Sequence, residues 1–147
     1  MNPPGTPSGS SEPAIVRRGA VAVIERQGRL LVIRRAEGIA APGAFCFPGG
    51  GIERGESEEA AVVRELQEEL AVKIDPLRRL WRSVTPWGVE LFWWLAELHP
   101  AAEPVANPAE VAGVYWHTPA EMAALAGLLE SNRQFLAAMA SGEIALG

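Results

Sequence analysis

The stretch GGIERGESEEAAVVRELQEELAV, which runs from Gly50 to Val72, decides the fold and the chemistry of this 147-residue chain. It places three carboxylates, Glu65, Glu68 and Glu69, at positions i, i+3 and i+4. In a helix these side chains fall within an arc of about 100° on one face. Crowded like charges destabilise a helix unless a cation lies among them, and Mg²⁺ prefers hard oxygen ligands. The cluster therefore predicts a metal site that faces outward from a helix.

The neighbouring residues predict that this helix spans Ser57 to Leu70. Ser57 suits the N-cap, and acidic residues follow it at the positive end of the helix dipole. Ala60, Val63 and Leu70 recur at helical spacing, so they predict the face that docks against a core. By charge pattern alone, a solvated acidic surface is the alternative interpretation of the glutamates, because charged helix faces are usually surface.

The same stretch resembles the Nudix box, which reads Gly, five residues, Glu, seven residues, then Arg-Glu-apolar-any-Glu-Glu-any-Gly-apolar. The positions that agree in order and spacing are Gly50, Glu56, Arg64, Glu65, Leu66, Glu68, Glu69 and Val72. One position differs, because Ala71 stands where the family has glycine. Since that glycine permits a positive φ after the helix, alanine is expected to destabilise the loop by about 1 kcal/mol or to shift the backbone slightly.

The resemblance implies an α/β fold, namely a Nudix-type α/β/α sandwich with a mixed sheet and a loop–helix–loop catalytic motif. It also implies a Mg²⁺ cofactor, with Mn²⁺ as a substitute. The implied metal ligands are the Gly49 carbonyl, Glu56, Glu65, Glu68 and Glu69. Arg64 would orient Glu65, and the catalytic base would be Glu65, Glu68 or Glu110. Glu110 precedes Trp116 as a loop glutamate does in MutT-like members, although a surface acid is the alternative interpretation.

Residues outside the box are expected to select the substrate. Arg35, at the end of the LLVIRR stretch, would lie near the nucleotide, and Asn132 falls near the place of a purine-reading asparagine in MutT-like enzymes. Trp87, in a Pro-Trp-Gly turn, is the best of the five tryptophans for stacking on a base. The alternative interpretation of Arg35 is a charge that faces solvent. Asn132 would otherwise be a residue at a helix start, and Trp87 an ordinary turn residue.

The resemblance thus implies Mg²⁺-dependent hydrolysis of a phosphoanhydride bond in a nucleoside diphosphate-X substrate, foremost an ordinary or oxidised nucleoside triphosphate. A hydrolase of dinucleoside polyphosphates or of nucleotide sugars such as ADP-ribose is the alternative. A non-catalytic ligand sensor on the same fold is a third hypothesis. Such sensors commonly lose box carboxylates, whereas this chain keeps Glu65, Glu68 and Glu69.

Composition limits the partners and the compartment. The net charge of −5 gives no general attraction for nucleic acid polymers or anionic membranes. No apolar run reaches the roughly 18 residues that a membrane helix needs. The single cysteine, Cys46, cannot form an intramolecular disulfide and fits a reducing, cytoplasmic location. We expect a monomer or homodimer that binds a small-molecule nucleotide.

The chain length fits one domain. Residues 1–13 are rich in Pro, Gly and Ser and predict a disordered tail, which leaves residues 14–147 as the domain. Strands are predicted over 15–25, 30–34, 45–48, 72–83, 89–98 and 111–117, and helices over 57–70, from Thr118 onward and over 131–139. Strands before and after the central helix favour a mixed sheet enclosed by helices over a regularly alternating α/β fold.

Overall fold

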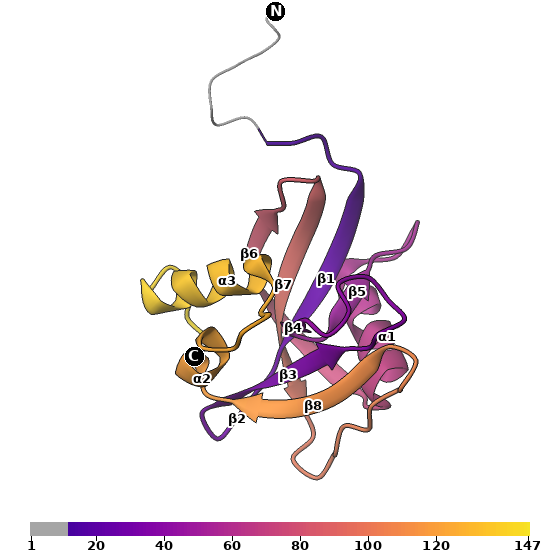
Figure 1. Cartoon of the computed structure of the whole chain (residues 1–147), viewed down its shortest axis with the longest axis vertical. Helices are drawn as coiled ribbons and strands as arrows, with labels where there is room; N and C mark the ends of the chain where they lie inside the picture. The colour runs from indigo at the N-terminus through magenta and orange to yellow at the C-terminus, as the bar shows by residue number, and fades with distance from the viewer. Residues whose placement is uncertain (1–11) are drawn as a thin grey trace, which may run out of the picture.

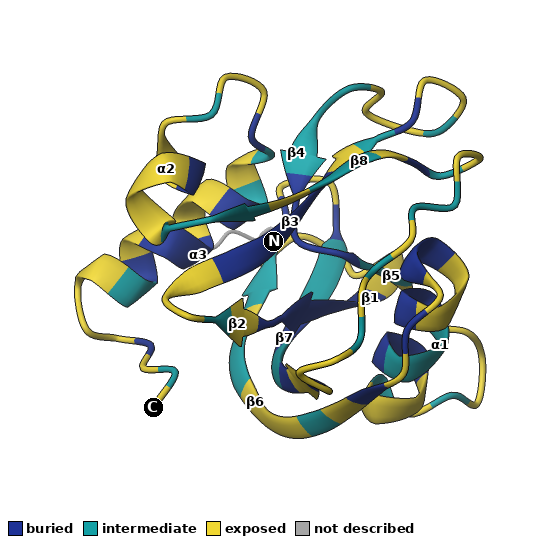
Figure 2. Ribbon diagram, turned by 90° about the horizontal axis from the view of Figure 1, so that it is seen from below, coloured by how far each residue is buried: buried dark blue, intermediate teal, exposed yellow. Residues whose placement is uncertain are grey.

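The computed structural model describes residues 12–147, so the predicted tail over residues 1–13 lies almost entirely outside the described residues. Two four-stranded sheets form the centre of the molecule. The helices α1 (Glu58–Leu70) and α3 (Glu130–Ala140) lie on opposite sides of the strands, as Figures 1 and 2 both show. The predicted α/β class with helices on both sides is therefore confirmed.

The first sheet is mixed, as predicted. Its strands follow the order β5 (Gly49–Gly51), β1 (Arg17–Val23), β7 (Val89–Leu98) and β6 (Ile74–Val84). The strands β1 and β7 are parallel, whereas the other two pairs are antiparallel. The register pairs Gly19 with Gly51 and Val21 with Gly49, so the glycine strand β5 lies directly along β1.

The second sheet is antiparallel and centres on β3. Three strands each pair with β3 (Arg29–Arg35), namely β2 (Glu25–Arg26), β4 (Phe45–Cys46) and β8 (Val111–His117). Gln27 and Gly28 have φ values of 53° and 78°, as two-residue hairpin turns require, so the predicted hairpin is confirmed. A register shift after Arg34 pairs Arg35 with Val111, the residue that follows Glu110.

The helix starts follow the predicted capping chemistry. The Ser57 hydroxyl accepts a hydrogen bond from the Ala60 N–H at the start of α1. Thr118 and Glu121 form a capping box at the start of α2 (Pro119–Ala123). No helix within residues 12–147 has both the length and the apolarity needed to cross a membrane.

Two apolar clusters hold the helices on the sheets. One cluster lies under α1 and includes Ala61, Val62 and Leu66, all of which are fully buried. The other surrounds Trp93 and Phe135, whose rings stack with centroids 4.8 Å apart and attach α3. Because each large apolar side chain stabilises the fold by roughly 1.5–3 kcal/mol when fully buried, the two clusters fix both helices relative to the strands between them.

The buried face of α1 differs from the predicted one. Ala60 is exposed, whereas Ala61 and Val62 lie in the core. Glu65 and Glu69 also lie on the buried face and are only 9% and 4% exposed, so the prediction of an outward-facing carboxylate cluster was wrong. Leu70 is buried as predicted, so the buried face overlaps the predicted one and extends around the helix to include the two glutamates.

Candidate active site

The glycine strand β5 brings its backbone against the carboxylates of α1. The Gly49 N–H donates a hydrogen bond to Glu69 Oε1 at 3.0 Å. A Cβ atom at residue 50 would collide with the Glu65 carboxyl group, and one at residue 49 would collide with the Ala20 carbonyl of β1. Glycine is therefore required at residue 49, where the collision is with the backbone of β1, while a side chain at residue 50 would force the Glu65 carboxyl group to move.

Three carboxylates converge where β5, α1 and the loop before β8 meet. One oxygen from each of Glu65, Glu69 and Glu110 lies within 4.8 Å of the others. Burial raises the pKa of Glu65, and burial raises the pKa of Glu69 to about 8, with the like charges of Glu65 and Glu110 adding to the effect. A cation among these oxygens would offset their charge, and an all-oxygen donor set suits Mg²⁺. The residues present therefore fit the cofactor that the resemblance implies.

Arg64 is the centre of an ion-pair network beside this triad. Its Nε and Nη2 donate to the two carboxylate oxygens of Glu56 at 2.7 and 2.9 Å. Its Nη1 donates to Glu65 Oε2 at 2.9 Å and to Glu68 Oε1 at 3.2 Å, while Nη2 also donates to the Gly51 carbonyl at 2.8 Å. The Arg64 guanidinium lowers the pKa of Glu56 to about 2. Arg64 thus fixes three glutamates relative to β5.

The loop before β8 is attached to the C-terminal end of α1 through Asn107. The Asn107 backbone N–H donates a hydrogen bond to the Glu69 backbone carbonyl at 2.9 Å. Its Nδ2 donates to the Glu68 carbonyl at 3.2 Å and to Glu110 Oε2 at 3.4 Å. Asn107 therefore positions Glu110 against α1. Sequence reasoning missed Asn107, because a single asparagine in a proline-containing loop carries no distinguishing pattern.

The structure separates the predicted metal ligands into two groups. Glu65 and Glu69 lie in the triad, together with Glu110, which the sequence predicts as a base. Glu56 and Glu68 lie outside the triad and contact Arg64, which also holds Glu65, and the Glu68 side chain is 48% exposed. Sequence spacing could not have shown this division, because it depends on where the Arg64 guanidinium lies.

A cleft of about 340 Å³ adjoins the glycine strand. It brings together Arg35, Trp87 and Asn132, the three residues predicted to bind substrate, from three separate segments of the chain. Apolar side chains also line the cleft, including Val21, Phe47, Leu91 and Leu129. The combination of an apolar lining with a few polar groups is typical of small-molecule sites.

Each of the three residues has a defined environment in the cleft. Asn132 is 4% exposed, and its Oδ1 accepts a hydrogen bond from the Phe47 N–H at 2.8 Å. Its Nδ2 donates to Ser131 Oγ at 3.2 Å, which leaves one of its two N–H groups for a ligand. Trp87 is 63% exposed in the turn between β6 and β7, which leaves its ring accessible for stacking. Arg35 Nε donates to the Ala40 carbonyl at 2.6 Å.

Comparison with known families assigns the chain. The family described as the NUDIX domain matches residues 14–139. The chain belongs to this family. The resemblance seen in residues 50–72 is thereby confirmed, and it extends over nearly all of the residues predicted to form the domain.

Individual relatives agree with this Nudix assignment. A Nudix hydrolase of Deinococcus radiodurans is 35% identical over 133 residues, which cover 82% of this chain and 66% of that protein. An 8-oxo-dGTP diphosphatase of Escherichia coli is 35% identical over 82 residues, or 53% of this chain and 64% of that protein. The crystal structure of a MutT protein from Methanosarcina mazei superposes with a TM-score of 0.71 at 19% sequence identity. The match covers 90% of this chain and 99% of that one, so the two share the same fold. The chain spans just under two thirds of the length of these two sequence relatives.

The one departure from the Nudix box leaves the backbone geometry in place. Ala71 has φ 56° and ψ 37°, the left-handed conformation that the family glycine would permit. Its N–H donates to the Gln67 carbonyl at 3.0 Å and closes the last turn of α1. The substitution therefore produces a strained backbone rather than a displaced loop.

Proposed function

We propose that this Nudix chain hydrolyses a phosphoanhydride bond in a nucleoside diphosphate-X substrate, with an ordinary or oxidised nucleoside triphosphate as the leading substrate. The observation that carries the proposal is the position of the carboxylate triad beside the cleft. Gly49 and Gly50 line the cleft, and the same two residues contact Glu69 and Glu65. A nucleotide whose base lies in the cleft would thus present its phosphates to the carboxylates.

The glutamates are proposed to hold Mg²⁺, or Mn²⁺ in its place. The proposed ligands are Glu65, Glu68, Glu69 and the Gly49 carbonyl, with Glu56 in support through Arg64, and Glu110 lies close enough to accept a proton from a water on the ion. When bound, the ion would neutralise phosphate charge and lower the pKa of a bound water. Magnesium sites of this kind combine a few carboxylates with substrate phosphates and water.

The chain itself would supply the proton acceptor and the positioning of the substrate. Glu110 is the proposed general base, because it comes from a loop outside α1 and Asn107 holds its Oε2. Glu65 and Glu68 are the alternatives for this role. Arg64 would act as a positioning residue, since its donors are used by Glu56, Glu65, Glu68 and the Gly51 carbonyl.

Substrate selection is proposed to reside in the cleft. Trp87 would stack on the base, Asn132 Nδ2 would donate to an acceptor on a purine edge, and Arg35 would lie near the phosphates. The names of the relatives support different substrates, since they include an 8-oxo-dGTP diphosphatase, a CTP pyrophosphohydrolase and an ADP-ribose pyrophosphatase. A substrate panel must therefore include oxidised and ordinary nucleoside triphosphates, ADP-ribose and dinucleoside polyphosphates.

The test is product analysis on that panel with Mg²⁺ present, for the unaltered chain and two variants. Glu68→Gln is expected to lower turnover by at least ~100-fold, because it removes one carboxylate charge from the proposed metal site. Glu59→Gln is the matched control, since Glu59 is an exposed acid on the same helix. Unchanged turnover in Glu68→Gln would refute the metal assignment, and no turnover on any substrate would favour the ligand sensor.

The role of Asn132 needs a variant that keeps its structural hydrogen bond. Asn132→Asp retains an oxygen for the Phe47 N–H and removes the Nδ2 donor, together with its bond to Ser131 Oγ. If Asn132 reads the base, the preference for purine over pyrimidine triphosphates should fall by about 10-fold, the usual effect of one lost hydrogen bond to a ligand. An unchanged preference in a folded variant would show that it does not.

A further inference from the structure

The strand β8 forms an open edge of the second sheet. Among the strands of residues 12–147, β8 pairs only with β3. The other side of β3 is occupied, because the Leu31 N–H donates to the Ile24 carbonyl at 3.0 Å and the Arg35 N–H donates to the Ala44 carbonyl at 2.8 Å. Leu31 and Arg35 therefore direct their backbone groups away from β8, and the residues that alternate with them direct theirs toward it.

The register shows which backbone groups of β8 face outward. Val32, which follows Leu31, directs its N–H and C=O toward β8 and pairs with Tyr115. Val114 and Trp116, on either side of Tyr115, therefore direct their N–H and C=O groups away from β3. Within residues 12–147, none of these four groups makes a hydrogen bond to another segment. They are available to a strand of another chain.

The other long edge strand, β6, is protected against such pairing, whereas β8 is not. β6 contains Pro76, three arginines and two register shifts against β7. Prolines, charged side chains and bulges are the features by which natural sheets block pairing at an edge. Residues 113–117 of β8 contain no proline, lysine, arginine or acidic residue, and their register with β3 is regular. This section of β8 can therefore accept another strand.

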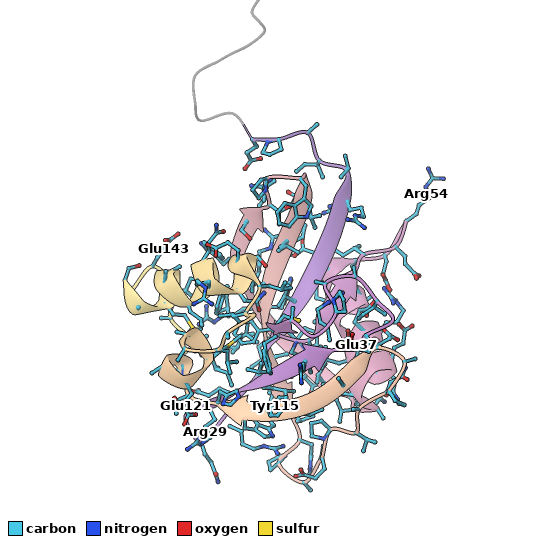
Figure 3. All side chains as sticks on the ribbon, in the orientation of Figure 1. Arg29, Glu37, Arg54, Tyr115, Glu121 and Glu143 are labelled. Atoms are coloured by element: carbon cyan, nitrogen blue, oxygen red, sulfur yellow. The ribbon has the colours of Figure 1, made fainter. Side chains whose placement is uncertain are left out.

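Tyr115 adds an exposed aromatic ring to this edge. It is 37% exposed and lies on β8 at the outside of the molecule (Figure 3). Its ring packs edge to face on Phe45 and stacks on His117, with centroids 5.8 Å apart in both pairs. These contacts fix the orientation of the ring. A fixed, partly exposed tyrosine beside unpaired backbone groups is typical of a protein–protein interface.

The charge of each edge favours a second copy of this chain as the partner of β8. Two identical strands that pair about a two-fold axis bring the residues near the axis against their own copies. An edge that carries charges of one sign, such as Arg78, Arg79 and Arg82 on β6, therefore repels itself. Residues 113–117 bring no like charges of acidic, lysine or arginine side chains together.

We propose that the chain forms a homodimer in which β8 pairs antiparallel with β8 of a second copy, with the two-fold axis at Tyr115. Val114 then exchanges two hydrogen bonds with Trp116 of the partner subunit, and Trp116 does so with the partner's Val114, which satisfies all four outward-facing groups. Tyr115 faces the partner's Tyr115 in a non-hydrogen-bonded pair, where side chains approach most closely. Gly113 faces the partner's His117. This inference is independent of the proposed function.

Sedimentation equilibrium of the full chain, at micromolar to sub-millimolar concentrations, tests the dimer. The unaltered chain is expected to reach twice its monomer mass. Tyr115→Glu should raise the dimer Kd by about 10-fold or more, because like charges directly opposite each other destabilise a strand pair. Tyr115→Lys should do the same, and an equimolar mixture of the two variants should restore the dimer. Leu77→Glu is the matched control, since Leu77 is 53% exposed on the other edge strand.

Cross-linking tests the register. Cα atoms in a non-hydrogen-bonded pair lie about 4.5 Å apart, which a disulfide can bridge. Mild oxidation should therefore join two chains of Tyr115→Cys but not of Leu77→Cys, while Cys46 is buried and common to both variants.

A monomer of the unaltered chain at every concentration would overturn the dimer. An unchanged Kd in Tyr115→Glu, a mixture that stays monomeric although circular dichroism shows both variants folded, or Tyr115→Cys that does not cross-link would overturn the pairing through β8. None of these measurements depends on turnover. Absence of turnover on the substrate panel would overturn the proposed function and leave the dimer standing.

Discussion

Ala71→Gly is expected to stabilise the protein, because residue 71 has φ 56°. An L-residue in the left-handed region is destabilised by roughly 1–2 kcal/mol relative to glycine. Glycine gains more freedom than alanine in the unfolded chain, which offsets about 0.4–1 kcal/mol of that difference. The net expectation is an increase of about 0.5–1 kcal/mol in the free energy of unfolding.

Urea denaturation followed by tryptophan fluorescence would measure this change. The control is Ala137→Gly, since Ala137 is an exposed residue inside α3 and glycine in a helix interior is destabilising by about 1 kcal/mol. The two Ala→Gly substitutions should therefore shift the urea midpoint in opposite directions. A midpoint for Ala71→Gly that is unchanged or lower would refute the left-handed assignment of residue 71.

Two further predictions follow from buried titratable groups. The pKa of Glu69, raised to about 8 by burial, keeps this carboxyl mostly protonated at pH 7, so Mg²⁺ binding should release close to one proton there and fewer as the pH rises above 8. Titration calorimetry in buffers of different ionisation enthalpy measures that number, and a value independent of pH from 6.5 to 9.5 would contradict it. Burial also raises the pKa of Cys46 to about 11, so a thiol reagent should label the native protein at least ~100-fold more slowly than the urea-unfolded protein. Equal labelling rates would show that the thiol is accessible.

Local signals in the sequence predicted much of the fold. The bounds of β7 and β8 agree with their apolar patterns, and the N-caps at Ser57 and Thr118 carry the predicted hydrogen bonds. These features depend on residues within a few positions of one another. The box spacing likewise identified Arg64 as the partner of Glu65, because both lie on one helix.

Contacts between distant segments were not predictable. The strand β5 was missed because three glycines carry no strand pattern, and it forms through its pairing with β1. Asn107 is positioned by the carbonyls of Glu68 and Glu69 at the end of α1, which no sequence pattern indicates. The cleft that unites Arg35, Trp87 and Asn132 depends on the placement of both sheets and the α3 start.

The error in the buried face of α1 has a physical origin that bears on function. Hydrophobic periodicity assumes that core-facing helix positions hold apolar residues, yet here Glu65 and Glu69 hold two of them. Burying two carboxylates disfavours their charged forms, which is the opposite of what stability alone would select. The glycines of β5 make this burial possible. Gly50 leaves room for the Glu65 carboxyl group, and the Gly49 N–H donates a hydrogen bond to Glu69. The position where the pattern fails is therefore the position where the chain gathers buried carboxyl groups, as expected at a site that binds cations.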